Sequence, residues 1–123
     1  MIKAKDLRIG NYIYNPVQKI NFKVDLVTLS NIINDNLKKS TKDEKYYYQP
    51  IELTEDILLK CGFEKSNTIF FIEEYLKFDI IRHDTENFYR LMKYSNGFRW
   101  FKYLHQLQNL YFALTNKELE IKL

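Results

Sequence analysis

The segment that decides the fold is residues 68–103, which read TIFFIEEYLKFDIIRHDTENFYRLMKYSNGFRWFKY. Aromatic and β-branched residues dominate it and partly alternate with polar residues, which is typical of strands with one buried face. Strands are expected at 68–72, 76–80, about 87–95 and 98–103, with Asn96 and Gly97 as a two-residue turn between the last two. The segment therefore predicts a four-stranded antiparallel meander.

A short helix is expected just before the meander, over about 55–61. Thr54 is placed to cap the amides of residues 56 and 57, and Gly62 can adopt the left-handed conformation that ends a helix. Such a helix would bury Ile57, Leu58 and Cys61.

A second helix is expected just after the meander. Apolar residues recur there at helical spacing through about residue 115, namely Leu104, Leu107, Leu110, Tyr111 and Leu114. A short strand over 119–123 is expected to follow this helix.

The N-terminal part, about residues 1–50, is expected to consist mainly of strands. Residues 7–16 predict a strand with a bend at Gly10, and residues 20–26 alternate cleanly between apolar and polar side chains. Residues 27–33 are interpreted as a further strand and 34–45 as an exposed polar loop.

Strands and helices are thus segregated along the chain, which favours an α+β fold over a parallel α/β fold. The expected architecture is a mainly antiparallel sheet, with N-terminal strands plus the meander, and two helices. The whole chain, 1–123, is expected to form a single compact domain, with the β part at about 1–50 and the remaining elements at about 51–123.

Composition excludes several classes of protein. Hydrophobic residues make up 46% and aromatic residues 16% of the 123 residues, which is too apolar for a disordered chain. Cys61 is the single cysteine, so intrachain disulfides and cysteine-rich metal sites are excluded. No apolar run approaches the length of a membrane span, and the first residues lack a signal-peptide core. A cytoplasmic protein without a membrane partner is therefore expected.

Catalytic motifs are absent from the sequence, so we expect no enzyme activity, no cofactor and no metal site. His83 and Asp84 stand beside Thr85 and Glu86, but a turn between strands needs the same polar residues. His105 is interpreted as a structural or interface histidine, and Cys61 as a buried, unreactive thiol.

Basic and aromatic residues interleave at the end of the meander. No acidic residue lies between Glu86 and Glu118. A pairing across Asn96 and Gly97 would place Lys93 opposite Trp100 and Leu91 opposite Lys102, and on the other face Tyr94 opposite Arg99 and Arg90 opposite Tyr103. The candidate binding residues in this hairpin are Arg90, Lys93, Tyr94, Arg99, Trp100 and Lys102.

Two interpretations of this hairpin remain open. Lys and Arg could hold phosphates while an aromatic ring stacks on an unpaired base, as in single-strand binding proteins. Alternatively, the rings fill a core or a protein interface and the basic side chains lie over them with their charges in water. The net charge of only +3 is low for a dedicated nucleic-acid-binding protein.

Tyr46, Tyr47 and Tyr48 form a second candidate contact element. Three successive tyrosines in an extended segment cannot all face one core, so at least one is expected at the surface, where tyrosine is common in protein interfaces.

Several stretches of the chain resemble a known group of proteins: LRIGNY at 7–12, PIELT at 50–54, LKCGFEK at 59–65 and YLHQLQNLYFALT at 103–115. In this order they resemble a group of small, uncharacterised proteins encoded by phages and prophages of Bacteroidetes bacteria. The resemblance covers about half of the chain, and usual members of the group carry an acidic residue where this chain has Asn116 and Lys117. No catalytic residues are known for the group.

The resemblance implies a function in which the chain acts by binding. Small phage proteins without catalytic motifs commonly inhibit host defence, so we expect a non-enzymatic inhibitor of a bacterial immune effector. An anti-CRISPR protein that binds an RNA-guided Cas nuclease or its guide RNA is one example. The alternatives are a nucleic-acid-binding accessory module of phage replication or transcription, and a virion component that oligomerises.

Overall fold

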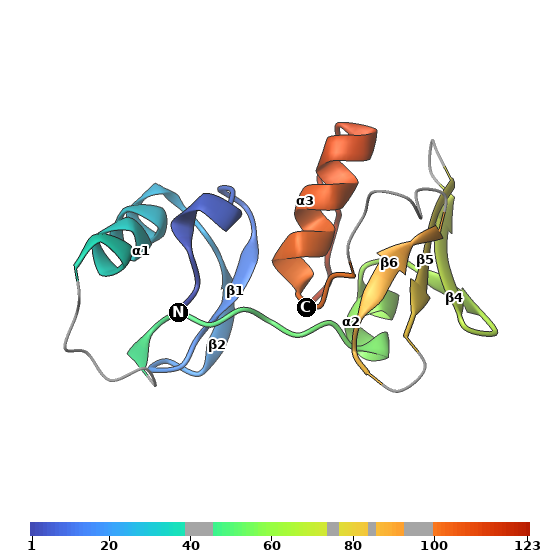
Figure 1. The fold of residues 1–123 in the computed structure, drawn as a ribbon, viewed down its shortest axis with the longest axis horizontal. Helices are drawn as coiled ribbons and strands as arrows, with labels where there is room; N and C mark the ends of the chain where they lie inside the picture. Colours follow the sequence, from blue (N-terminus) through green and yellow to red (C-terminus); the bar gives the residue numbers. More distant parts are fainter. Residues whose placement is uncertain (39–45, 74–76, 84–85, 93–99) are drawn as a thin grey trace. The chain divides into compact units, whose positions relative to one another are not determined.

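The computed structural model describes residues 1–38, 46–73, 77–83, 86–92 and 100–123 (Figure 1). In chain order its elements are η1 (Ala4–Asp6), β1 (Tyr12–Asn15), β2 (Ile20–Lys23), α1 (Leu26–Leu37), α2 (Glu55–Lys60), β3 (Glu64–Ser66), β4 (Ile69–Glu73), β5 (Lys77–Arg82), β6 (Tyr89–Leu91) and α3 (Leu104–Thr115). The strands form a two-stranded and a four-stranded antiparallel sheet. The α+β fold is therefore confirmed.

The chain divides into two compact units. Unit 1 contains residues 1–51 and 104–109, and unit 2 contains residues 52–103 and 110–123. Helix α3 therefore begins in unit 1 and continues in unit 2. That the two units form one compact domain remains a prediction.

Unit 1 is built on the β1–β2 hairpin, in which Tyr12 pairs with Lys23 and Asn15 with Ile20. The buried core of this unit contains Ile2, Leu7, Ile13, Val24 and Ile32. The predicted bend before β1 is present, because Gly10 has a φ of +96°, a conformation that side chains with a Cβ rarely adopt.

Helix α1 replaces the strand predicted over 27–33 and the start of the loop predicted from residue 34. Asp25 ends the alternating stretch, because its carboxylate accepts a hydrogen bond of 2.8 Å from the Thr28 amide and so caps a helix. Thr28 and Ile32, four residues apart, are the buried residues of this helix. The prediction of a strand was wrong because the N-cap and the helical spacing override the strand pattern that precedes them.

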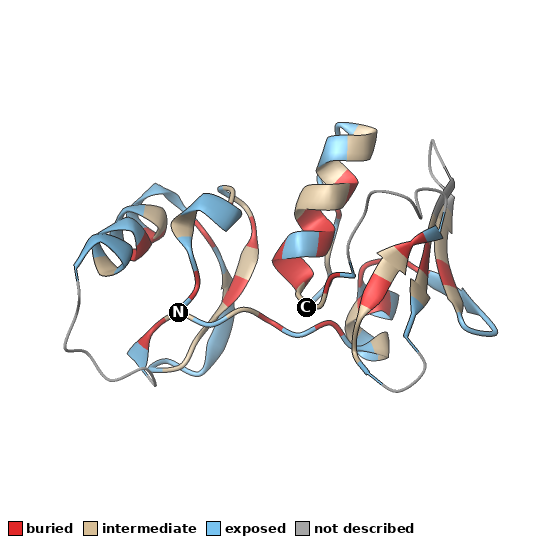
Figure 2. Cartoon of the chain, viewed as in Figure 1, coloured by how far each residue is buried: buried red, intermediate tan, exposed pale blue. Residues whose placement is uncertain are grey.

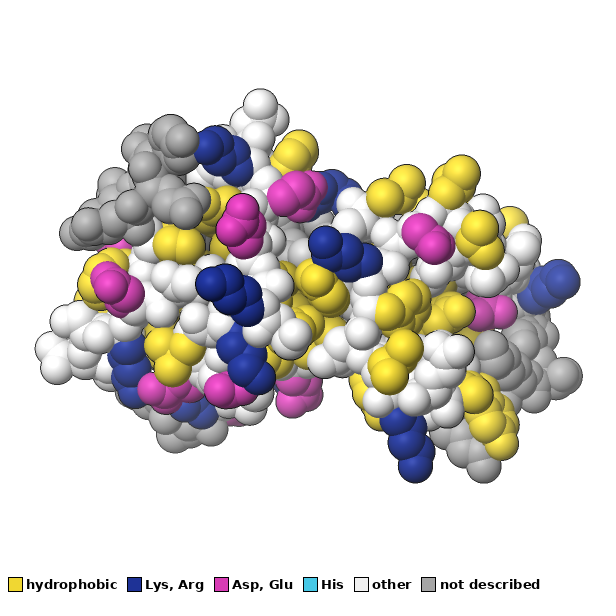
Figure 3. Space-filling view, turned by 180° about the vertical axis from the view of Figure 1, so that it is seen from behind, with side chains coloured by type: hydrophobic (Ala, Val, Ile, Leu, Met, Phe, Trp, Pro, Cys, Tyr) yellow, Lys and Arg dark blue, Asp and Glu magenta, His cyan; other side chains and the backbone are white. Residues whose placement is uncertain are grey.

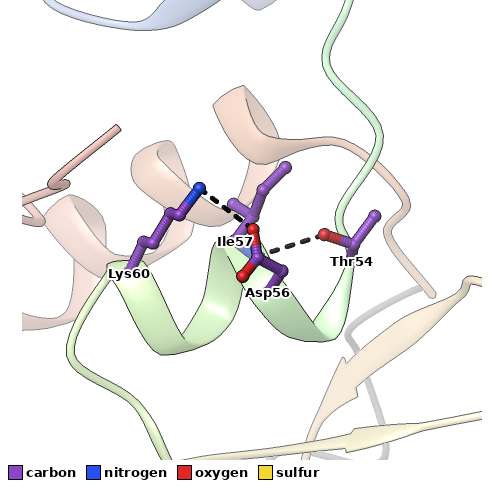
Figure 4. Close-up of polar contacts among 4 residues, drawn as sticks. All are labelled: Thr54, Asp56, Ile57 and Lys60. Carbon is purple, nitrogen blue, oxygen red and sulfur yellow. Dashed lines mark hydrogen bonds and ion pairs between the residues drawn. The ribbon is translucent and has the colours of Figure 1, made fainter.

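Helix α2 confirms the prediction for residues 55–61 (Figure 4). The Thr54 hydroxyl accepts a hydrogen bond of 3.2 Å from the Ile57 amide, and Lys60 pairs with Asp56 at 3.0 Å. Gly62 ends the helix with a φ of +89°. Leu58 and Cys61 are buried as expected, whereas Ile57 is only half-buried.

The sheet of unit 2 has the strand order β3-β4-β5-β6. Strand β3, over the exposed Glu64–Ser66, was not predicted, because it has no buried face to give it an apolar pattern. Of the predicted strand 98–103, the described residues 100–103 contribute one bridge to the sheet, between Tyr89 and Phe101.

The C-terminal strand predicted over 119–123 is not formed. Leu119 is buried, and the Lys122 amide donates a hydrogen bond of 3.1 Å to the carbonyl of Lys60 at the end of α2, so the segment packs against unit 2 without forming a strand.

One face of the four-stranded sheet is the core of unit 2. Phe70, Ile80 and Leu91 lie side by side across β4, β5 and β6, and all three are buried, as are Tyr89 and Phe101 (Figure 2). Because side chains alternate along a strand, the neighbours of these residues lie on the opposite, outer face.

Candidate binding site

The outer face of the β5–β6 sheet carries the cations and rings that the sequence singled out, but in a different register. Tyr89 pairs with Phe101 through two hydrogen bonds of 2.8 and 2.7 Å. The predicted turn at Asn96 and Gly97 would instead have paired Arg90 with Tyr103. The observed register differs by three residues, and an odd shift exchanges the two faces of a strand, so the predicted pairs Arg90–Tyr103 and Leu91–Lys102 were wrong. The predicted pairs that include Lys93 and Tyr94 lie outside the described residues.

Trp100 is the centre of this outer face. The Arg90 guanidinium carbon lies 5.0 Å from the centroid of the Trp100 ring, in a cation–π contact. The His83 ring meets the same indole edge-on, with centroids 5.3 Å apart. Trp100 nevertheless keeps 39% of its surface exposed. We call Phe88, Arg90, Trp100, Lys102, Ile81 and His83 the Trp100 face.

Lys102 is the second cation of the Trp100 face and lies beside Phe88 and Tyr103. Its ammonium group lies 5.6 Å from the centroid of the Phe88 ring and 5.9 Å from that of Tyr103. It also pairs with Glu52 at 3.1 Å, and the hydrogen bond and charge of that carboxylate raise the pKa of Lys102. The carboxylate of Glu52 therefore balances the charge of Lys102, which is part of the positive charge of the Trp100 face.

Polar atoms near this face lack hydrogen-bond partners within the part of the chain that the structure describes. They are the buried Nε of Arg90 and the buried Oδ1 of Asp79. Asp79 shares the outer face with Arg90, because Ile81, two residues from Asp79, pairs directly with Arg90. Buried polar atoms are normally satisfied, so these two atoms are exceptions on this face.

Comparison of the chain with protein-family models, with curated proteins and with solved structures gave no match. The resemblance to phage and prophage proteins therefore remains an expectation from the sequence. In the described ranges, every helix is too short or too polar to cross a membrane.

The other predicted contact residues are distributed as follows. Lys93, Tyr94 and Arg99 lie outside the described residues, so their contribution stays a prediction. Tyr46 is 46% exposed, which agrees with the expectation that at least one of the three tyrosines reaches the surface.

Tyr47 and Tyr48 contribute to the packing of unit 1. Tyr47 is buried, and the ring of Tyr48 packs against Phe22 with centroids 5.4 Å apart. Of the three tyrosines, Tyr46 is therefore the best placed to contact a partner.

The groups considered for catalysis are arranged as follows. Asp84 and Thr85 lie outside the described residues, and His83 contacts Trp100. Burial raises the pKa of the Cys61 thiol to about 12, so this thiol is unreactive near neutral pH. His105 is buried in unit 1, and burial lowers its pKa, while the charge of Asp6 opposes the shift.

A buried polar cluster in unit 1 was missed by sequence reasoning. The side-chain oxygen of Gln108 accepts a hydrogen bond of 2.8 Å from the Tyr12 amide, and its nitrogen donates to the Gly10 carbonyl at 3.2 Å. Asn109 accepts a hydrogen bond of 2.8 Å from the Asn11 side chain. We call Asn11, Gln108 and Asn109 the polar joint.

The polar joint brings together residues from two of the stretches noted in the sequence. LRIGNY at 7–12 and YLHQLQNLYFALT at 103–115 meet in it, and Arg8 also donates to the Asn109 side chain at 2.9 Å. The residues visible in the sequence were the amides Asn11, Gln108 and Asn109, but their separation of about a hundred residues gave no reason to pair them.

Proposed function

We propose that the chain is a non-enzymatic inhibitor of a bacterial immune effector, and that it acts by binding a protein through the Trp100 face. The observation that carries the proposal is a partly exposed Trp100 held between Arg90 and His83. Tryptophan and arginine are the residues most enriched among those that dominate binding energy at protein interfaces. A ring already held by its neighbours also loses little conformational freedom on binding.

Charge supports a protein partner over nucleic acid. Lys102 is paired with Glu52, and Lys65 is paired with Glu55 at 3.0 Å, so two cations of unit 2 are already balanced. Hydrophobic side chains also reach the surface in groups separated by charged ones, as Figure 3 shows for one side of the molecule. Mixed apolar and charged surfaces of this kind are usual in protein interfaces.

Binding of single-stranded nucleic acid is the second candidate. Arg90 beside Trp100 and Lys102 beside Phe88 provide rings for stacking and cations for phosphates. In this case the chain would serve as an accessory module of phage replication or transcription.

An affinity capture experiment separates the two functions. The tagged chain is used to capture partners from the lysate of a bacterial host that carries defence systems, with and without nuclease, and captured proteins and RNA are identified. The inhibitor proposal expects one immune effector that survives nuclease and loses activity when the purified chain is added. Capture of nucleic acid alone, abolished by nuclease, would replace it with the second candidate.

Salt dependence and matched variants sharpen this result. Arg90→Glu and Trp100→Ala are expected to lose the partner, whereas Leu59→Ala, an exposed apolar position on α2, is expected to keep it. Binding to phosphates would weaken steeply with salt, because each contact releases counterions, while a protein interface centred on Trp100 would respond less.

A further inference from the structure

Unit 2 also has a small pocket of about 150 Å³, which shares His83 with the Trp100 face. Its walls come from the start of α2, the turn between β3 and β4, and the end of β5. The residues that line it are Glu55, Lys65, Asn67, Thr68, Phe70, Arg82 and His83, which we call the His83 pocket. Pockets for drug-sized ligands are at least about 300 Å³, so this pocket is suited to a single small group.

The lining of the His83 pocket favours one negative charge. Lys65 and Arg82 are cations and Glu55 is the carboxylate that pairs with Lys65, so with neutral His83 the pocket has a formal charge of +1. Asn67 and Thr68 add an amide and a hydroxyl that can donate hydrogen bonds. Arg82 is oriented by a hydrogen bond of 2.8 Å to the side chain of Asn87.

A carboxylate at the end of a side chain fits this pocket better than a phosphodiester. A carboxylate brings the single charge that balances the pocket, and arginine binds carboxylates through paired hydrogen bonds. A phosphodiester carries the same charge but has the chain attached on both sides, so it needs an open groove rather than a pocket. A terminal phosphate would bring a second charge close to Glu55.

His83 connects the pocket to the proposed interface. His83 lines the pocket, and its ring contacts Trp100 at 5.3 Å between centroids. A partner protein covering Trp100 would therefore also contact a residue of the pocket. We infer that the His83 pocket receives a carboxylate, from an aspartate or glutamate side chain or the C-terminus of the partner protein. This inference rests on the proposed function, because it takes the occupant from the same partner.

The test uses acetate as the probe and the full chain as the receptor, so it needs no knowledge of the partner. Acetate is added in place of chloride at constant ionic strength, and NMR follows the His83 ring and the amides of Asn67 and Thr68. The expected result is a saturable shift of these signals. Inorganic phosphate and a single-stranded RNA oligonucleotide are titrated in parallel.

Three variants test whether the affinity for acetate changes in the expected direction. Arg82→Gln should weaken acetate binding about fivefold, the effect of losing roughly 1 kcal/mol. Glu55→Gln should strengthen it, because it removes the repelling carboxylate and releases Lys65. Lys122→Gln, an exposed cation outside the pocket, should leave it unchanged. Thermal unfolding of each variant shows that the fold is retained.

The outcomes separate this inference from the proposed function. No saturable shift with acetate, or equal affinity in all variants, would overturn the carboxylate site whatever the capture experiment shows. A response to phosphate and RNA but not to acetate would also overturn it and favour the nucleic-acid function. Saturable acetate binding with the predicted order of variants would support the site even if no immune effector is captured.

Discussion

The polar joint of unit 1 and the Trp100 face of unit 2 are both polar clusters, but they differ in how they are completed. Gln108 is only 1% exposed, and both of its side-chain polar groups bond to the backbone of the same unit. Arg90 in unit 2 instead stacks on an exposed ring, and its buried Nε has no hydrogen-bond partner in the described part of the chain.

This difference distinguishes residues that stabilise the fold from residues that can contact a partner. A buried polar group that is satisfied inside the chain fixes a fold, because its loss leaves its partners unpaired. A ring that stays partly exposed, as Trp100 does beside Arg90, can instead be covered by another molecule. The two clusters should therefore respond to substitution in opposite ways.

The largest effect on stability is expected at the polar joint. Gln108→Leu should lower the free energy of unfolding by about 2–4 kcal/mol, because the Tyr12 amide and the Gly10 carbonyl both lose their partner. Urea denaturation followed by circular dichroism measures this loss. Ala113→Leu, at an exposed position of the same helix, is the control and should change stability by less than about 0.5 kcal/mol. Equal effects of the two substitutions would show that the polar joint does not contribute specifically to the stability of the fold.

The next effect concerns binding. Trp100→Ala should weaken capture of the partner by about thirtyfold or more, which corresponds to roughly 2 kcal/mol for a central interface residue. Because the ring also packs against Arg90 and His83, the affinity is compared at a temperature where the variant is folded. The affinity is measured with the captured protein immobilised, and Leu59→Ala serves as the control. An unchanged affinity of the Trp100 variant would remove this face from the interface.

A smaller effect is expected at the cap of α2, which belongs to unit 2 but lies outside the Trp100 face. Thr54→Ala should lower the free energy of unfolding by about 1 kcal/mol, because the Ile57 amide loses its acceptor. Partner affinity should stay the same. If affinity fell together with stability, the distinction between structural and binding residues in unit 2 would be lost.

The smallest effect is a pH dependence in unit 1. Hydrogen bonds from the backbone and side chain of Thr28 hold the pKa of Asp25 below its ordinary value of 3.8. The charge of Asp25 therefore stabilises the fold above that value, and this stability is lost as the pH falls through the lower pKa of the folded state. The stability gap between wild type and Asp25→Asn should shrink between about pH 6 and about pH 2.5 in urea denaturation. A constant gap would contradict the role of the charge.

The sequence predicted the elements whose signals are local. The cap at Thr54, the glycine after α2 and the apolar spacing of α3 each lie within a few residues, and those helices formed as expected. Helix α1 was missed because the alternation of 20–26 was extended past Asp25, although Asp25 and Thr28 already stood at capping distance. β3 could not be recognised, because its residues are all exposed.

The candidate sites were harder to predict because they depend on register and on distant pairs. The Arg90–Trp100 contact follows from the pairing of Tyr89 with Phe101, and a shift of three residues put different side chains opposite each other. The polar joint pairs Asn11 with Asn109, which no local pattern relates. Arg90, Trp100 and Lys102 were therefore identifiable from the sequence although their partners were not, and the residues of the polar joint were not identified at all.

The most direct test of the account measures stability and partner capture on the same two variants. The two variants should differ in which property they lose. Gln108→Leu should be less stable but, at a temperature where it is folded, should capture the nuclease-resistant partner as wild type does. Trp100→Ala, measured under the same conditions, loses the partner. The account would be contradicted if Trp100→Ala captured the same partner with wild-type affinity, or if both variants lost binding only in proportion to their stability.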